Sequence, residues 1–507
     1  MNDGIILFIP LLLSLILFGV FKRIYSALVI GTLSSVVIIN QFNFKASFSY
    51  LASEVISPVL LNANHFAIIV FTIMIGALTG LLRKSGAIDT FIHYLSSLIV
   101  GKRSLQFVTT LSGLLIFFDD HANCRSVGSS MRKAFSNLGV SKEKLAYIAD
   151  STAAPVACLA LVSTWIAFQV GLIDDALISS NTNLDAYALF IQSIPYNFYA
   201  LFTLMIVLTV SVTGRDFGPM YSKEKFSTKN IEKTSFPLQT IDRKKLLLFF
   251  IPTLALIFIT FSVLLVSPKT NSFMAMLIGA SLSLFIALFI IFANNLAEPH
   301  DAFSWIESGI KDLLPCVALL IFAWLFAKGL SQLLLAPYLA NLISSSLHLA
   351  LLPTLVFAIS ALLSFITGTS FGTMAWLMPT TLPAIFLCSD DISLYCAGTA
   401  ALLGGAVFGD HCSPYSDTTI LSSSSTQCDL RAHSSTQMPY ALLGAGVCVI
   451  SGILVLVYDI SHTQVLVLGI AFIYATFKII GKKTVFSLAK ENKTHSSPLP
   501  DLPDITD

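Results

Sequence analysis

The sequence predicts an all-α polytopic membrane protein with about eleven transmembrane helices, two re-entrant hairpins and broken helices in an inverted repeat. Of its 507 residues, 55% are hydrophobic and only 11% are charged, whereas soluble domains have about 25% charged residues. Apolar runs long enough to cross a bilayer recur along almost the whole chain. The third observation is a weak internal sequence symmetry around two polar interruptions, described below.

The apolar runs give the expected spans in chain order. Because Lys and Arg concentrate in short cytoplasmic loops, the basic 214–245 loop is expected inside and the 174–185 loop, which has no Lys or Arg, outside. The first span lacks a basic leader and a cleavage site, so it is expected to be retained. The N-terminus is then outside and the C-terminus cytoplasmic, in a bacterial inner (plasma) membrane. The spans are 5–21, 24–40, 66–82, 143–173, 186–213, 246–267, 272–293, 313–335, 392–426, 436–458 and 464–481.

Residues 104–131 are predicted to form a re-entrant hairpin. Lys102/Arg103 precede this stretch and Arg132/Lys133 follow it, so both of its ends should face the cytoplasm. Its tip then lies near "FFDDHANC", which starts at Phe117. Irregular backbone at membrane depth persists only where it is buried in protein or lines a water-filled cavity.

A second unit repeats this pattern. Residues 352–379 form another apolar arm, polar tip and apolar arm, and each hairpin is followed by a long span with a polar, proline-containing break. Pro155 and Pro414 occupy matching positions in the broken helices 143–173 and 392–426. The charge pattern gives the two units opposite orientations, which is typical of secondary transporters with a midplane site between inverted repeats.

This pattern divides the chain into segments. Residues 1–65 are N-terminal helices, and 66–213 and 313–458 are the two repeats. The basic 214–245 loop is their cytoplasmic linker. The other segments are the connecting helices 246–312, a last helix at 459–489 and a disordered cytoplasmic tail at 490–507.

Acidic residues at the breaks suggest what the site binds. One charged Asp in a bilayer costs about 2.5–3.5 kcal/mol on insertion scales, so these carboxylates need a proton, a cation or a basic partner. Hard cations such as Na⁺ prefer oxygen ligands, and an Asp that holds either Na⁺ or a proton couples the two ions by competition. A Na⁺ site is expected at Asp150, Asp410 and Asp417. The other acids are Asp119 and Asp120, and the hydroxyls are Thr367, Thr369, Ser370, Ser413, Ser416, Thr418 and Thr419, with Gly368 at a backbone bend.

Several alternatives stay open. Ser, Thr and Gly also serve close helix packing in membranes, and one of Asp119 and Asp120 could simply cap a helix. Asp410, His411 and Ser413 have the residue types of a catalytic triad, but sequence neighbours rarely form one. No GxSxG, HExxH or phosphate-binding loop motif occurs, and the eight cysteines lack metal-ligand spacing. The chain is therefore not expected to be an enzyme or to carry a cofactor.

Long stretches resemble one known family. "GDHCSPYSDTTILSS" (409–423), "QMPYAL" (437–442), "FDDHANC" (118–124), "KLAYIADSTAAPVA" (144–157) and "FITGTSFGT" (365–373) resemble the NhaC family of bacterial sodium/proton antiporters, over roughly residues 66–460. The resemblance implies exchange of Na⁺ for H⁺ by alternating access. It also implies cation-site roles for Asp119, Asp120, Asn123, Asp150, Ser151, Thr152, Asp410, Ser413 and Asp417.

The chain departs from the family pattern at a few positions. His121 stands where a tyrosine is expected and Tyr415 replaces an aliphatic residue. These changes bear on ion selectivity and pH range more than on the fold, and His121 is either a pH sensor or a satisfied hairpin histidine. The family also includes Na⁺- or H⁺-coupled carriers of organic acids and amino acids, in which Arg125 and His411 would anchor a carboxylate. Expected partners are the bilayer, Na⁺ and H⁺, with a homodimer as an option and no nucleic acid.

Overall fold

The computed structural model describes residues 3–227, 241–266 and 271–483. The predicted tail at 490–507 and part of the 214–245 loop lie outside the described residues. Ten described helices are long and apolar enough to cross a membrane, or up to 13 if each bent pair is one span. The prediction of an all-α polytopic membrane protein is therefore confirmed.

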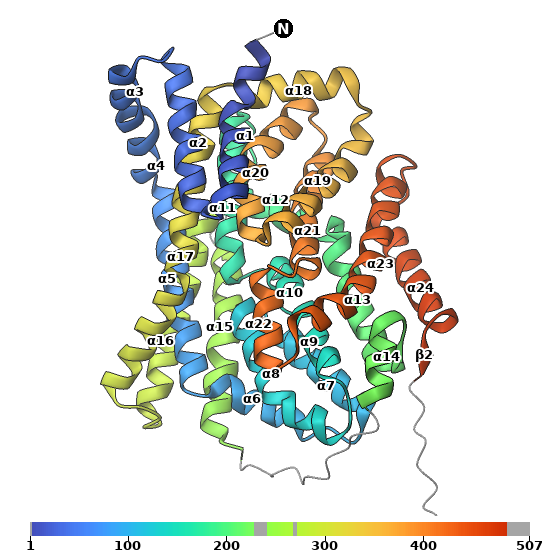
Figure 1. Cartoon of the computed structure of the whole chain (residues 1–507). Helices are drawn as coiled ribbons and strands as arrows, with labels where there is room; N and C mark the ends of the chain where they lie inside the picture. Colours follow the sequence, from blue (N-terminus) through green and yellow to red (C-terminus); the bar gives the residue numbers. More distant parts are fainter. Residues whose placement is uncertain (1–2, 228–240, 267–270, 484–507) are drawn as a thin grey trace, which may run out of the picture.

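The N-terminal helices lie along one side of the molecule (Figure 1). The helix at 24–39 and the helical stretch 44–60 meet at a bend of 117°. The stretch 44–60 was not predicted because its polar residues break up the hydropathy. These elements are α1 (Asp3–Phe21), α2 (Ile24–Ile39), α3 (Phe44–Tyr50), a π-helical turn (Leu51–Ile56) and α4 (Ser57–Leu60).

The next stretch contains the first predicted hairpin and the first predicted broken helix. The chain here forms helices of 6 to 22 residues that are separated by interruptions of up to six residues. They are α5 (Ala63–Lys84), α6 (Ala87–Ser96), α7 (Lys102–Leu115), α8 (Asp120–Asn137), α9 (Lys142–Ser151), α10 (Ala154–Leu159), α11 (Thr164–Ser179), α12 (Ala186–Ser193), a 3₁₀ turn (Ile194–Tyr196) and α13 (Phe198–Thr213).

A linking stretch follows and includes a short helix that the sequence did not predict. Its elements are β1 (Arg215–Asp216), α14 (Gly218–Ser227), α15 (Arg243–Val266) and α16 (Ser272–Ala293). β1 pairs antiparallel with β2 (Lys482–Lys483), so the end of the described chain meets the linker.

The last stretch contains the second predicted hairpin and broken helix. The expected span 313–335 is part of a 34-residue helix, and the expected span 436–458 begins earlier, at Leu430. The elements are α17 (Pro299–Gln332), α18 (Leu335–Ser346), a 3₁₀ turn (Leu349–Leu351), α19 (Leu352–Thr367), α20 (Ser370–Cys388), α21 (Ile392–Cys412), α22 (Asp417–Thr426), α23 (Leu430–Leu456) and α24 (His462–Ile479).

Both hairpins turn with the same capping device. Asp119 caps α8 by accepting a hydrogen bond from Ala122 N at 2.5 Å, and Thr369 caps α20 through Gly372 N at 3.2 Å. Before Thr369 the chain passes through Gly368 in the left-handed region, at φ +70°, where only glycine is unstrained.

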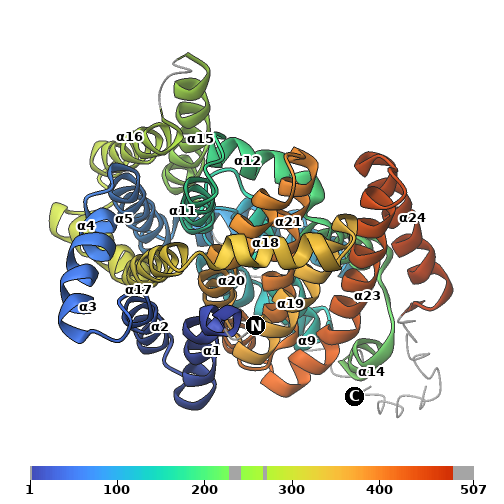
Figure 2. The same ribbon diagram turned by 90° about the horizontal axis from the view of Figure 1, so that it is seen from above.

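The two breaks meet in the middle of the molecule, where α22 packs against α8 and α9, and α19 against α21. Figure 1 shows α8, α9, α10 and α22 gathered below α21. The view from above shows α18 crossing over this region and α23 and α24 beside it (Figure 2). Segments far apart in sequence therefore surround one buried centre.

A close crossing of α5 and α17 lies beside this centre. A Cβ added to Gly309 would lie 2.0 Å from Gly76 O, and one added to Gly80 would lie 2.3 Å from Trp305 O. The two backbones touch with no side chain between them, which is the packing that small residues allow in membrane helices.

Candidate functional site

The first break separates α9 from α10. Helix α9 ends at Ser151, and Thr152 and Ala153 lead into α10, which has Pro155 at its start. Pro155 has no N–H to continue a helical ladder, so it fits the first turn of a new helix. The side chain of Asn123 pins the tip of the first hairpin to this break, because its Nδ2 donates to Gly113 O at 2.6 Å and to Thr152 O at 2.9 Å.

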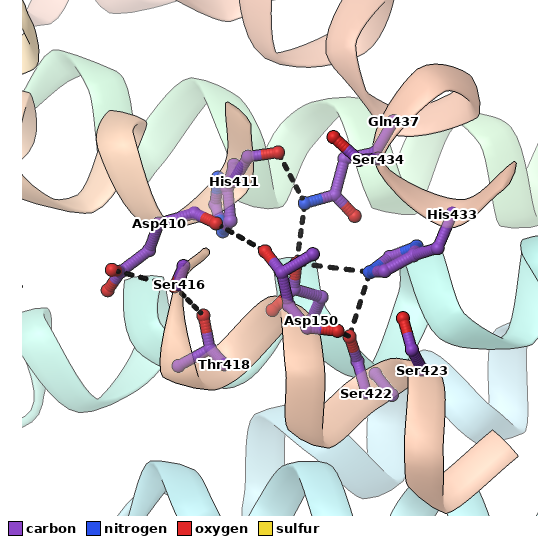
Figure 3. A network of polar contacts seen from close by, with 12 residues as sticks. Asp150, Asp410, His411, Ser416, Thr418, Ser422, Ser423, His433, Ser434 and Gln437 are labelled. Carbon is purple, nitrogen blue, oxygen red and sulfur yellow. Dashed lines mark hydrogen bonds and ion pairs between the residues drawn. The ribbon is translucent and has the colours of Figure 1, made fainter. Parts of the chain in front are cut away.

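Asp150 is the central carboxylate of this break and is fully buried. Its Oδ2 accepts a hydrogen bond from Gln437 Nε2 at 2.6 Å and lies 3.4 Å from His433 Nε2. Both partners come from α23, as Figure 3 shows. The other oxygen, Oδ1, has no hydrogen-bond partner among the described residues, so one side of a buried carboxylate is left for an ion or a proton.

Gln437 joins Asp150 to the second broken helix. Its Nε2 also donates to the backbone oxygen of His411, at 3.1 Å (Figure 3). Because both neighbours of Nε2 are acceptors, the amide orientation is fixed and the carbonyl oxygen Oε1 points away. Oε1 can only accept, and it has no partner within the described chain.

A small cavity of about 10 Å³ lies next to Gln437, with room for one water-sized sphere. Five of the side chains that line it carry a buried polar atom that has no partner at hydrogen-bond distance and angle among the described residues. Two of these side chains, Tyr147 and Ser151, lie one turn apart on α9. The atoms are Tyr147 OH, Ser151 Oγ, Thr203 Oγ1, His411 Nε2 and Gln437 Oε1. So many unpartnered atoms around one cavity indicate a site for a small polar or ionic guest.

The second break, between α21 and α22, carries Asp410. Its Oδ2 accepts a hydrogen bond from Ser370 Oγ on α20, and its Oδ1 accepts one from Ser416 Oγ at 3.0 Å. Ser416 lies 3.1 Å from Thr418 Oγ1 (Figure 3), and Thr419 donates to the backbone oxygen of Asp410 at 2.6 Å. Both oxygens of this buried carboxylate are already occupied by hydroxyls.

The tip of the first hairpin lines a separate polar cavity of about 100 Å³, large enough for several waters. Asp119, His121 and Arg125 line it from α8, and Arg83 and Asp312, which form an ion pair, line it from α5 and α17. Asp120 is buried next to Asp119, while His121 and Arg125 are exposed.

The other predicted residues either lie at the second break or form hydrogen bonds within their own helix. Ser413 is buried at the end of α21, where its Oγ accepts from Tyr415 N at 3.3 Å. Thr152 bonds its own helix, and so does Thr367. Asp417 lies in the first turn of α22 and is exposed, as is its neighbour Tyr415, while Pro414 is partly buried between the helices. No hydrogen bond or ion pair within the described residues joins Asp417 to Asp150 or Asp410.

His433 and Gln437 are the site residues that the sequence analysis missed. The polar stretch before Met438 placed the start of the predicted span at residue 436, which left His433 outside the membrane, whereas α23 begins at Leu430. An ionisable residue inside a span is a functional candidate by default. A longer span would therefore have drawn attention to His433, which is fully buried and lies 2.8 Å from Ser422 Oγ.

The described residues contain no group of three or more His, Cys, Asp or Glu residues arranged to hold a metal ion. A transported Na⁺ would instead depend on one carboxylate with hydroxyl and carbonyl oxygens. Asp150, Ser151 and the carbonyl oxygen of Gln437 offer such a set of donors.

Comparisons with known proteins agree with this architecture. Residues 156–457 match the model of the "Na+/H+ antiporter family". An uncharacterized protein of Haemophilus influenzae is 32% identical over 456 residues, which cover 85% of this chain and 87% of that protein. The family match includes Asp410, His433 and Gln437 but begins after Asp150.

Two solved transporters share the fold at low identity. The YdaH transporter of Alcanivorax borkumensis has a TM-score of 0.59 and 15% identity, covering 82% of this chain and 89% of that chain. MtrF of Neisseria gonorrhoeae, described with a class of antimetabolite efflux pumps, has a TM-score of 0.59 and 12% identity, covering 82% and 85%.

Proposed function

The chain belongs to the Na⁺/H⁺ antiporter family, and on that premise we propose that this secondary transporter exchanges Na⁺ for H⁺, with Asp150 as the carboxylate for which the two ions compete. Family membership supports transport rather than catalysis. The observation that carries the proposal is the buried Asp150 carboxylate, which has one free oxygen among the described residues. Its hydrogen-bond donor Gln437 lines a small cavity with several other polar side chains.

The exchange follows from the charge of this site. With Na⁺ bound, the ion neutralises the Asp150 carboxylate, and the oxygens of Ser151 and Gln437 complete its shell. Without Na⁺, a proton serves the same purpose, since an uncompensated buried carboxylate is costly. In either state the neutralised site can change its exposure from one face of the membrane to the other. With neither ion bound, the charged carboxylate prevents this change.

Alternating access fits the position of the site. Asp150 belongs to the first broken helix, while Gln437 also binds the second one through the backbone of His411. A movement of one predicted repeat against the other would open the site to one face at a time, as in other transporters with broken helices. The charge pattern of the loops supports an outside N-terminus and a cytoplasmic C-terminus.

The test uses purified protein in liposomes that contain a pH dye. A Na⁺ pulse should move protons in the wild type, and Asp150→Asn should abolish that movement because the neutral amide cannot exchange a proton for a cation. Asp390→Asn is the matched control, since Asp390 is exposed between α20 and α21. Exchange at the wild-type rate by Asp150→Asn would contradict the proposal.

A second candidate is a Na⁺- or H⁺-coupled carrier of an organic acid or amino acid. It is favoured by the polar cavity in which Arg83, His121 and Arg125 could receive a carboxylate. The fold it shares with MtrF, which is described with a class of antimetabolite efflux pumps, is compatible with an organic substrate. If tight vesicles do not respond to Na⁺, Li⁺ or K⁺, this candidate takes over, and uptake of labelled carboxylates and amino acids tests it.

A further inference from the structure

An open groove of about 470 Å³ lies at the start of α7, outside the candidate transport site. Its volume is within the range of pockets that bind small molecules. The charge pattern of the loops places this end of α7 on the cytoplasmic side of the membrane. The groove is lined by Val100, Gly101, Lys102, Arg103, Ser104, Gln106 and Gly214.

Two cations lie along this groove. Lys102 is held there because its Nζ donates a hydrogen bond to Gly139 O at 2.8 Å. Arg103 is exposed and lies across the end of α13, since its Nε would be 3.3 Å from a Cβ added to Gly214. No carboxylate among the described residues forms an ion pair with Arg103. Its guanidinium can therefore bind an anionic group of a ligand through two parallel hydrogen bonds.

The first turn of α7 adds backbone donors to the groove. Ser104 Oγ accepts hydrogen bonds from Val100 N and Gly101 N, both at 2.8 Å, and these bonds fix the turn that leads into the helix. The N–H groups of Lys102, Arg103 and Ser104 come next and have no acceptor within the helix. Together with the helix dipole, such N–H groups favour a phosphate at the start of a helix.

Gln106 supplies an acceptor to the same groove. Its side chain is only 5% exposed, and its Oε1 has no hydrogen-bond partner among the described residues. A buried amide oxygen without a partner is costly, and it can only accept a hydrogen bond. A ligand that suits the groove therefore carries an anionic group for Arg103 and a hydroxyl for Gln106.

The end of α24 adds further cations beside the groove. Arg215 follows the cap of α13, and its Nη1 donates to Lys478 O at 3.0 Å and to Gly481 O at 2.8 Å. These bonds bring the end of α24 next to the end of α13, so the groove is part of a larger basic surface. The exposed cations on this part of the chain are Lys478, Lys482 and Lys483.

The nearby acids do not neutralise this surface. Asp216 is buried and pairs with Lys144 of α9. Glu224 is also buried and accepts a hydrogen bond from Ser141 N at 2.9 Å. Both carboxylates are therefore occupied inside the protein. A positive surface at the cytoplasmic face attracts anionic lipids, with a gain of about fivefold in affinity for each Lys or Arg.

Apolar side chains flank the cations. Val100, just before α7, is 95% exposed, and Ile479, at the end of the candidate span α24, is 83% exposed. Acyl chains can remove such side chains from water, which is favourable. A soluble phosphate ester would leave both of them uncovered. The occupant that fits the groove and its surroundings therefore has an apolar tail as well as an anionic head.

We propose that the groove at the start of α7 binds an anionic phospholipid whose headgroup carries a hydroxyl, such as phosphatidylglycerol. The phosphate binds Arg103 and the first turn of α7, a headgroup hydroxyl donates to Gln106, and the acyl chains cover Val100 and Ile479. The bound lipid thereby joins the ends of α7, α13 and α24. This site is independent of which ion or solute the protein transports.

The first test measures lipid affinity in the wild type. Purified protein in a neutral detergent is titrated with each lipid, and native mass spectrometry counts the bound molecules. Phosphatidylglycerol should bind about tenfold more tightly than the zwitterionic phosphatidylcholine. It should also bind about threefold more tightly than phosphatidylethanol, which has the same charge but no headgroup hydroxyl.

Three outcomes of this titration would contradict the proposal. Equal affinity for phosphatidylglycerol and phosphatidylcholine would overturn the site. Equal affinity for phosphatidylglycerol and phosphatidylethanol would overturn the role of Gln106. Glycerol phosphate that binds as tightly as phosphatidylglycerol would show that the groove takes a soluble anion and not a lipid.

The second test uses variants in the same titration. Arg103→Gln removes one cation and should weaken phosphatidylglycerol binding about fivefold. Gln106→Leu should bind phosphatidylglycerol and phosphatidylethanol equally. Lys84→Gln is the matched control, because Lys84 is an exposed cation at the end of α5 outside the groove, and it should bind like the wild type. Wild-type affinity in Arg103→Gln would overturn the site, and the wild-type preferences test it even if a variant does not fold.

Discussion

The two broken helices have the same outline and different chemistry. Both interrupt a helix at a buried aspartate, with a proline a few residues later, and both face a hairpin tip. At the first break, one oxygen of Asp150 is held by Gln437 and the other has no partner among the described residues. At the second break, Ser370 and Ser416 occupy both oxygens of Asp410.

The difference indicates that the two breaks have different roles. A carboxylate with a free oxygen can receive an ion, while a carboxylate whose two oxygens are both bound by serine hydroxyls mainly holds the backbone of its break in place. Similar architecture in two repeats therefore does not imply two equivalent binding sites. The following predictions are ordered from the largest expected effect to the smallest.

The sharpest contrast is between Asp150→Asn and Asp410→Asn. Removing the charge that binds the ion should cost about 3 kcal/mol, or about 100-fold in the Kd for Na⁺. Asp410→Asn keeps an acceptor for one serine and should change the Kd by about tenfold or less. Binding of radioactive Na⁺ to the purified variants measures both, and the comparison fails if Asp410→Asn shows the larger loss.

Gln437→Leu tests whether the first site depends on α23. Leucine has a similar volume but removes the hydrogen bond to Asp150 and the oxygen that faces the cavity. A hydrogen bond to a charged group contributes about 1.5–3 kcal/mol, so Na⁺ affinity should fall by about 10- to 100-fold in the same binding assay. Gln464→Leu, at the exposed start of α24, is the control. Equal affinity in the two variants would remove Gln437 from the site.

Gly368→Ala tests how the second break is held. Gly368 has φ +70°, and a Cβ there would lie 2.8 Å from Tyr415 O in the break. The backbone strain alone should cost about 1–2 kcal/mol, which would lower the thermal unfolding midpoint. Gly446→Ala, where nothing lies within 4 Å of the added Cβ, should leave the midpoint unchanged or raise it. If both variants unfold like the wild type, the contact between the hairpin tip and the break is not maintained.

Asp417→Asn should have the smallest effect. The sequence analysis placed Asp417 in the Na⁺ site, but its side chain is exposed at the start of α22. An exposed charge contributes about 0–1 kcal/mol, so the Kd for Na⁺ should change by a small factor. A loss as large as that of Asp150→Asn would return Asp417 to the site and show that α22 moves inward when the ion binds.

The sequence predicted the fold class because hydropathy and basic loops are local properties that a bilayer constrains strongly. It also singled out Asp150 and Asp410, since acids within apolar runs need a reason to be there. It did not predict α14, whose ten residues lie in a charged loop and are folded by contacts with α9 and α23. Whether such a segment forms a helix depends on its tertiary contacts rather than on its local sequence.

The partners of the acids could not be predicted for the same reason. Gln437 lies 287 residues from Asp150, and no local pattern connects them. Which acid has a free oxygen also depends on side-chain positions across several helices. Residue type therefore identified the candidate carboxylates, while the structure distinguishes their surroundings.

The crossing of α5 and α17 at Gly76, Gly80 and Gly309 bears on how the conformational cycle can be observed. Backbone atoms in contact have no rotamers to exchange, so this pair should keep its separation while the broken helices change theirs. Spin labels on the outer faces of α5 and α17 would then give one constant distance in every state. That distance supplies an internal ruler, against which the displacement of α9 or α22 can be measured in the same sample.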